Sequence, residues 1–217
     1  MSFEGLDLSQ ATKDWEYLKE VGENPNSAEW KEEKRDKKEN IVIYSREHED
    51  EAKKLLEFRG DAEIDAKIEN IVEIFNDPEQ RVCWDNTMEE FSHLWKNDDG
   101  FIVNYSRTKP FLGGLIASRD FIAILKFKPT EKGHWISAGS STKQVPVDEK
   151  KGVTRGWCFP AGWYMEPIGE NKTKIYYLIR TDLKGALPLW AVNKGSFAAI
   201  AMFFTSIRDE VKKRYSK

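Results

Sequence analysis

Two oppositely charged side chains, Arg81 and Asp85, lie four residues apart in a short segment that begins with Asp77 and Pro78. Asp at a helix cap followed by Pro at the first position is a typical helix start, with Gln80 following at the third position. A spacing of four places Arg81 and Asp85 on one helix face. Their order opposes the helix dipole, so helix stability explains the pair poorly. Two explanations remain: a structural ion pair, or a paired-charge site for a ligand.

The residue types used in catalysis form no recognisable motif. His48, His93 and His134 are scattered, and neither a Gly-x-Ser-x-Gly elbow nor a His-Glu-x-x-His sequence is present. Cys83 and Cys158 have no metal-binding or disulfide-framework spacing, and Cys83 is predicted to be a small buried hydrophobic residue. We therefore predict that the protein is not an enzyme and uses no metal and no cofactor.

Length and composition indicate one soluble domain spanning residues 1–217. The formal net charge is −3, which does not favour nucleic-acid binding. Eight Trp and twelve Phe supply much aromatic bulk for a core or a pocket. The N-terminal ten residues are acidic and lack an apolar stretch, so no signal peptide is predicted and a cytoplasmic location is expected.

The longest predicted element is a helix that starts at Pro188 and runs to the C-terminus, where basic residues suit the helix dipole. One face carries large apolar residues at helical spacing, namely Trp190, Phe197, Ile200, Phe204, Ile207 and Val211. Between Phe197 and Phe204 the helix is apolar on almost all sides, yet it is too short for a membrane span. It is either a core helix across a sheet or a lid over a lipid cavity.

The other predicted elements surround that helix. Helices are expected near residues 8–22, after Asp65 as its cap, and after Asp77. Strands are expected at residues 41–44, 55–64, 90–95, 101–108, 120–127, 134–141, 152–166 and 173–183. Residues 27–40 are charge-rich and are expected to form a helical turn or a solvated connector. This order predicts an α+β fold in which a curved antiparallel sheet grips the last helix.

One predicted loop is unusually apolar. Residues 109–118, KPFLGGLIAS, contain Pro and Gly-Gly but also four large apolar residues, Phe111, Leu112, Leu115 and Ile116. Exposed apolar loops generally contact a partner, a membrane or a ligand. This loop is the second candidate lid.

Four stretches resemble the START lipid-transfer domains, a family related to the steroidogenic acute regulatory protein. They are RVCWD at residues 81–85, SRDF at 118–121, GVTRGW at 152–157 and TDLKGALP at 181–188. The resemblance extends over nearly the whole chain. It implies a helix-grip fold whose U-shaped sheet encloses a tunnel for one lipid, with the apolar loop and the last helix closing the mouth.

The resemblance also assigns roles to individual residues. In the phosphatidylcholine-binding member, whose site pattern this chain matches best, the residues at the positions of Arg81 and Asp85 contact the headgroup. Tyr105, Phe121 and Phe159 align with its aromatic cage, and aromatic faces bind quaternary ammonium groups. Trp190 aligns with a Trp implicated in membrane contact. Arg119 and Asp182 are typical of the family and are expected to be structural.

Other ligand classes match less well. The acid–arginine pair of sterol-binding members is replaced here by Ser106 and Leu125, and two amide positions of the ceramide-binding pattern are Tyr105 and Gly139. The sequence thus predicts a monomeric lipid carrier with transient membrane contact, for a phosphatidylcholine-like phospholipid. A carrier of ceramide, sterol or fatty acid, a lipid-sensing regulatory module and a helix-grip enzyme remain as alternatives.

Overall fold

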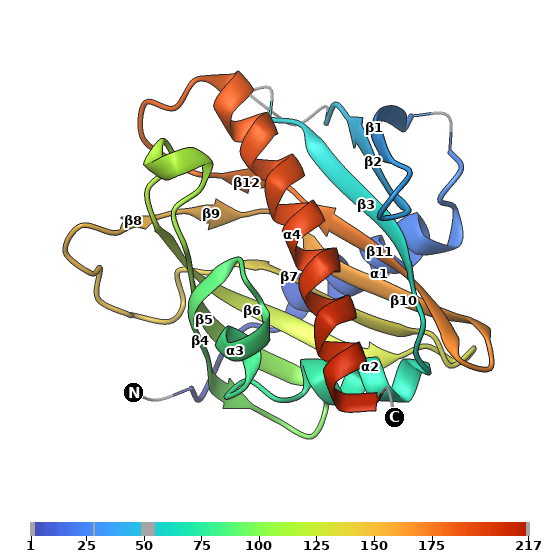
Figure 1. The fold of residues 1–217 in the computed structure, drawn as a ribbon. Coiled ribbons are helices and arrows are strands. Elements are labelled where there is room, and N and C mark those ends of the chain that lie inside the picture. The colour runs from blue at the N-terminus through green and yellow to red at the C-terminus, as the bar shows by residue number, and fades with distance from the viewer. Residues whose placement is uncertain (1–2, 28, 49–54, 216–217) are drawn as a thin grey trace.

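The computed structural model describes residues 3–27, 29–48 and 55–215. A curved sheet of ten strands wraps around the long C-terminal helix α4 (Leu189–Tyr215), which crosses the concave face of the sheet (Figure 1). Eight neighbouring strand pairs along the sheet are antiparallel. The predicted α+β helix-grip fold is therefore confirmed.

The sheet has the strand order β1-β2-β3-β11-β10-β7-β6-β5-β4, with the short β8 paired parallel to β6. Its strands are β1 (Lys31–Asp36), β2 (Ile41–Arg46), β3 (Glu57–Ile64), β4 (Met88–Lys96), β5 (Phe101–Thr108), β6 (Arg119–Pro129), β7 (Trp135–Ser141), β8 (Thr154–Arg155), β10 (Ala161–Gly169) and β11 (Lys172–Ile179). A separate two-stranded sheet joins β9 (Trp157–Cys158) to β12 (Thr181–Asp182).

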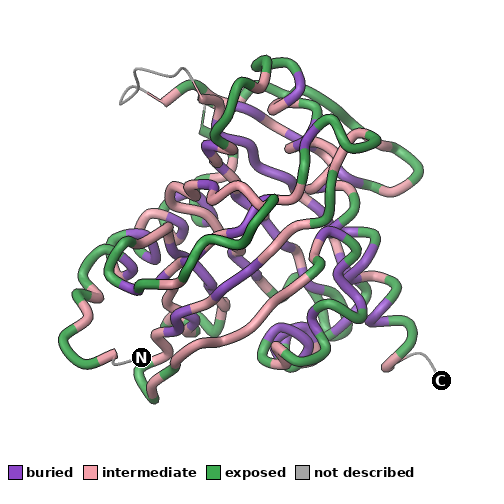
Figure 2. The backbone as a smooth tube through the Cα atoms, turned by 90° about the vertical axis from the view of Figure 1, so that its left-hand side faces the viewer, coloured by how far each residue is buried: buried purple, intermediate pink, exposed green. Residues whose placement is uncertain are grey.

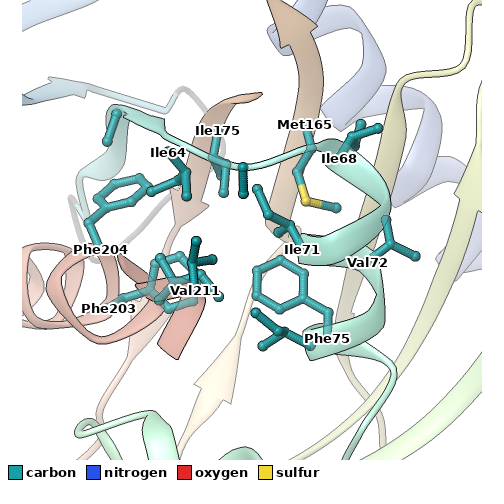
Figure 3. Close-up of a cluster of buried hydrophobic side chains, with 14 of the residues drawn as sticks. Ile64, Ile68, Ile71, Val72, Phe75, Met165, Ile175, Phe203, Phe204 and Val211 are labelled. Atoms are coloured by element: carbon teal, nitrogen blue, oxygen red, sulfur yellow. The ribbon is translucent and has the colours of Figure 1, made fainter. Parts of the chain in front are cut away.

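Helix α4 approaches the sheet closely because β3 has a glycine, Gly60, at the point of contact. A Cβ atom built on Gly60 of β3 would lie 2.3 Å from the Ile200 side chain of α4 and 2.9 Å from that of Phe204. Ile200, Phe203 and Phe204 are almost completely buried, and α2 (Ile68–Phe75) closes the same core from one end (Figure 3). Burial of each such side chain contributes about 1.5–3 kcal/mol to stability. From Ile200 onward, α4 is therefore anchored as a core helix.

Helix α1 (Ser9–Glu23) covers the opposite, convex face of the sheet. Its Trp15, Leu18 and Val21 pack with Ile136 and Tyr164 in a second hydrophobic cluster. Both faces of the central strands are therefore covered, and the buried positions follow the strands through the interior (Figure 2). Side chains that alternate along one strand consequently enter two different environments.

Several local predictions were wrong. Residues 31–36 form edge strand β1 rather than a connector, since the strand pairs with β2 although its side chains are mostly exposed. Helix α2 begins at Ile68 after Lys67, without an Asp65 cap. The predicted strand at residues 152–166 is divided into β8, β9 and β10. Cys83 is exposed instead of buried.

Candidate functional site

A cavity of about 200 Å³ lies between the concave face of the sheet and the N-terminal half of α4. Its wall is mainly apolar and comes from β5, β6, β7, β10, β11, α4 and the loop at residues 109–118. The residues that line it include Arg81, Phe91, Asn104, Ser106, Phe111, Ile116, Arg119, Phe121, Ala123, Leu125, Gly139, Cys158, Trp163, Leu183, Gly195 and Ser196. An apolar cavity with a few polar groups is the usual form of a small-molecule site.

Arg81 and Asp85 meet where the short helix α3 (Arg81–Trp84) ends. The Nη2 and Nε atoms of Arg81 lie 2.6 and 2.8 Å from Oδ2 of Asp85. The backbone N–H and the hydroxyl of Thr87 both donate to Oδ1 of Asp85, at 3.0 and 2.6 Å. Asp85 is only 1% exposed, and each of its oxygens already has partners, so its charge is satisfied within the protein.

The guanidinium of Arg81 is also surrounded by aromatic rings. The ring centroids of Trp84, Trp163 and Phe91 lie 4.5, 5.0 and 5.4 Å from it, and Phe75 and Phe203 lie at 5.7 Å. Arg81 lines the cavity, whereas Asp85 is not among the lining residues. This aromatic cluster therefore already holds a cation, the arginine of the chain itself.

The structure separates the three aromatic residues predicted to form a cage. Phe121 lines the cavity. Tyr105 lies in the cluster on the other side of the sheet with Val103 and Ile122, and its hydroxyl is 3.2 Å from Oδ2 of Asp120. Phe159 lies outside the cavity, and the centroid of its ring is 4.3 Å from the guanidinium carbon of Arg180. The predicted cage of Tyr105, Phe121 and Phe159 is thus not assembled.

Strand alternation explains the error at Tyr105. Its neighbours Asn104 and Ser106 face the cavity, and successive side chains of a strand point to opposite faces. Of the positions compared with other ligand classes, Ser106, Leu125 and Gly139 do line the cavity.

The sequence analysis missed two polar residues of the cavity wall, Asn104 on β5 and Trp163 on β10. Oδ1 of Asn104 and Nε1 of Trp163 are buried without a hydrogen-bond partner among the described residues. Leaving a buried polar atom unpaired costs roughly 1–3 kcal/mol, so both atoms are candidates for contact with a bound molecule. The period-2 pattern of β5 could have indicated Asn104, because it shares a face with Ser106.

The loop at residues 109–118 and helix α4 both contribute to the cavity wall, through Phe111 and Ile116 and through Gly195 and Ser196. As expected from the sequence, we treat these two segments as the mouth of the cavity. Trp190 and Leu115 are 59% and 48% exposed, and Leu189 is exposed beside Trp190. Phe111 and Leu112 are half-buried, and Ile116 is buried against α4. None of the helices within the described residues is long and apolar enough to cross a bilayer.

Other predicted lid residues on α4 lie too deep for membrane contact. Ile200 and Phe204 are buried in the core against β3, and Phe197 packs edge-on against Phe58 with ring centroids 5.2 Å apart. None of these three lines the cavity. The exposed part of the lid is therefore limited to the loop tip and the start of α4.

Arg119 links the two segments that form the mouth. Its Nε donates to the carbonyl of Leu183 at 2.8 Å, and its Nη1 donates to the carbonyl of Ala117 at 2.7 Å. Ala117 belongs to the apolar loop, and Leu183 precedes α4. The arginine is buried and lines the cavity.

Burial shifts the pKa of Cys158, which lines the cavity, and of His93 on β4. Burial raises the pKa of the Cys158 thiol to about 11. Burial, with the positive charges of Lys96 and Arg81, lowers the pKa of His93 to about 4. No three His, Cys, Asp or Glu side chains within the described ranges are grouped to hold a metal ion.

A family model described as "START domain" matches residues 11–215. Among curated proteins, the chain is 29% identical over 140 residues to "Steroidogenic acute regulatory protein, mitochondrial" of Oncorhynchus mykiss, covering 63% of this chain and 48% of that protein. It is 28% identical over 135 residues to "StAR-related lipid transfer protein 5" of Mus musculus, covering 61% of this chain and 63% of that protein. The matched region therefore spans about half to three fifths of these relatives.

Solved structures share the fold. Human StAR-related lipid transfer protein 5 has a TM-score of 0.81 at 23% identity, covering 95% of this chain and 99% of that chain. Human STARD10 has a TM-score of 0.77 at 19% identity, and the match covers 99% of this chain and 86% of that chain. Identities this low support the similarity of fold and nothing finer.

Proposed function

This chain belongs to the START domain family, and we propose that it holds one lipid in the cavity under α4 and carries it between membranes. One observation carries the proposal: a mainly apolar cavity lies inside the sheet, and the loop and helix that contribute Phe111, Ile116 and Gly195 to its wall also carry exposed Leu115 and Trp190. The relatives named as lipid-transfer proteins support the same activity. As expected from the sequence, the proposed carrier is monomeric and cytoplasmic.

Lipid entry requires the mouth to widen. The cavity volume of about 200 Å³ is smaller than the roughly 300–1,000 Å³ typical of ligand pockets. The loop at residues 109–118 and the first turns of α4 can move without disturbing the core, because the core contacts of α4 begin near Phe197 and Ile200. The proposed entry step is therefore an outward movement of these two segments.

The proposed membrane contact is made by the exposed apolar tip, defined as Leu115, Leu189 and Trp190. These are three of the six exposed large hydrophobic residues among those described. Tryptophan suits the bilayer interface because its ring is apolar and its N–H is polar. Contact of the tip with lipid would place the mouth of the cavity at the membrane surface.

Energetics are compatible with reversible exchange. Moving an acyl chain of about 16 carbons out of water gains on the order of 12 kcal/mol, at about 0.8 kcal/mol per methylene. A membrane already provides most of this gain, so transfer into an apolar cavity is nearly balanced. Selectivity must then come from the polar groups of the wall, where unpaired charge is costly.

The expectation of a phosphatidylcholine-like ligand retains limited support. Arg81 and Phe121 line the cavity, but Tyr105 and Phe159 do not. Asp85, the expected partner of the choline group, is already bonded to Arg81 and Thr87. Phosphatidylcholine is therefore one competitor in the test rather than the preferred ligand.

The test is transfer of fluorescent lipids from donor to acceptor vesicles by the purified protein. We expect transfer without chemical change of the lipid, confirmed by mass spectrometry of the recovered lipid. Ala123→Phe, which fills the cavity, should reduce transfer at least tenfold, whereas Thr205→Phe on the exposed face of α4 should not. Absence of transfer for phosphatidylcholine, ceramide, cholesterol and fatty acid would refute the proposal.

A further inference from the structure

Among the described residues, two charged side chains line the cavity, those of Arg81 and Arg119, and one of the two has a counter-charge there. Arg81 is paired with Asp85. Arg119 is only 5% exposed, yet within the described part of the chain no carboxylate lies within ion-pair distance of it. The nearest acid in sequence, Asp120, is bonded to Arg155 and Tyr105 on the other face of β6.

The guanidinium of Arg119 donates two hydrogen bonds, and neither acceptor carries a charge. Its two acceptors are the neutral backbone carbonyls of Leu183 and Ala117. Its third nitrogen, Nη2, has no hydrogen-bond partner among the described residues. Burial without a counter-charge is costly and lowers the pKa of Arg119 from its ordinary value. An anion placed beside it would remove that cost.

The surroundings of Arg119 reinforce the positive potential. The N-terminus of the 27-residue helix α4 lies at the mouth, and helix N-termini attract anions. Residues 109–118 and 183–199 include Lys109, Lys184 and Lys194 but no Asp or Glu. Lys184 is paired with Asp182. These two segments therefore carry net positive charge in a chain of net charge −3.

We propose that Arg119 binds the acidic group of the lipid, a carboxylate or a phosphate, at the mouth of the cavity. The inference rests on the proposed lipid-binding function and specifies its ligand as an acidic amphiphile. Its apolar body lies along the wall beneath α4, and its anionic group lies between the apolar loop and the start of α4. A charged guanidinium binds both kinds of oxyanion through short, charge-assisted hydrogen bonds.

This position also couples ligand binding to closure of the mouth. The guanidinium that meets the acid is the one that holds Ala117 of the loop and Leu183 before α4. A bound anion therefore stabilises the arginine in the position that joins the two segments. Release of the acidic lipid should accordingly be slower than release of a neutral lipid with the same chain.

The test compares lipids that differ only in the polar group. Displacement of a neutral pyrene-labelled fatty alcohol is measured with oleate, oleyl alcohol, 1-oleoyl lysophosphatidic acid and monoolein. The parent protein should bind oleate or lysophosphatidic acid at least tenfold more tightly than the neutral lipid of the same chain. Preference for oleate alone identifies a carboxylate ligand, and preference for lysophosphatidic acid alone identifies a phosphate ligand.

Arg119→Gln should abolish the preference for the acid, bringing the ratio of oleate affinity to oleyl alcohol affinity close to one. Binding of the alcohol thus reports that the cavity is intact. The control Lys172→Gln removes one positive charge at the far hairpin, where it pairs with Glu63, and should keep the preference. If Arg119→Gln does not fold, Arg119→Lys decides the question, because it retains the charge and should retain most of the preference.

Equal binding of acid and alcohol by the parent, or an undiminished preference in folded Arg119→Gln, would overturn this inference. Loss of the preference in folded Arg119→Lys would also overturn it, because the charge is still present. Neither result affects lipid binding itself. Failure of every tested lipid to bind or transfer would instead refute the proposed function.

Discussion

Ile116 of the apolar loop rests directly on Gly195 of α4. A Cβ atom built on Gly195 would lie 2.6 Å from Cδ1 of Ile116, closer than two such carbons approach. Both residues line the cavity, and Ile116 is buried although its neighbour Leu115 is exposed. The closed mouth therefore depends on a glycine that lets the loop reach the helix backbone.

Replacing Gly195 by Ala should loosen the mouth. The added methyl group displaces the Ile116 side chain, while alanine favours the helix by roughly 0.5–1 kcal/mol relative to glycine. We expect faster lipid exchange between vesicles, by about threefold or more, with little loss of stability. Ile116→Ala in the Gly195→Ala background removes the steric conflict. If exchange rates are unchanged in Gly195→Ala, the contact does not control entry.

The exposed apolar tip should dominate vesicle binding. Trp190→Ala and Leu115→Asp should each reduce cosedimentation with vesicles at least threefold and slow transfer, because they remove apolar contact with the bilayer. Ile168→Asp is the matched control, since Ile168 is similarly exposed but lies at the end of β10. Equal losses in the control and the tip variants would contradict the assigned membrane face.

The Arg81–Asp85 pair should be essential for stability. Arg81→Gln leaves the buried Asp85 carboxylate without its cation, and breaking a buried pair typically costs about 3–5 kcal/mol. Urea unfolding of Arg81→Gln, Asp85→Asn and the double variant would show the coupling, with the double variant losing less than the sum. The rise in melting temperature on adding lipid separates a structural role of the pair from a ligand-binding role. If the pair is only structural, Arg81→Gln keeps the full lipid-dependent rise; if the pair binds the ligand, the variant loses it.

His93 should make stability depend on pH. Its pKa is lowered to about 4 in the folded protein, chiefly by burial and further by Lys96 and Arg81, whereas the unfolded chain binds the proton near 6.5. Between these values the unfolded state binds more protons, so the free energy of unfolding falls as pH decreases from about 6.5 to 4. Urea midpoints of His93→Gln should decline less over this range than those of the parent. Identical declines would show that other groups cause the effect.

The elements of the fold were largely predictable because they depend on local patterns. Turn residues and period-2 alternation indicated most strands, and helical spacing indicated α4 and its buried face. The apolar loop was predictable for the same reason, since four large apolar residues stand beside Pro110 and Gly-Gly. Edge strand β1 was missed because its exposed charged side chains leave no alternating pattern.

The members of the site were less predictable, and Tyr105 and Asn104 show why. A register error of one residue exchanges the two faces of a strand, so aligning an aromatic residue with a cage position placed it on the wrong side of β5. Arg81 and Asp85 form an ion pair, which was one of the two explanations that their spacing offered. That the aromatic cluster encloses Arg81 itself depends on α3, β4, β10 and α4 meeting, which no local pattern shows.

The sequence by itself determined the helix-grip architecture, the two segments at the mouth and the adjacent charges Arg81 and Asp85, because spacing and hydrophobic periodicity act over a few residues. Only the tertiary structure decided which of the two cavity arginines, Arg81 or Arg119, is paired with a carboxylate. Arg119 is buried between carbonyls from residues 117 and 183, and the lack of a counter-charge for it within the described part of the chain follows from the packing of segments far apart in sequence. Compensation of a buried charge depends on distances in space, and those follow only from the packed fold.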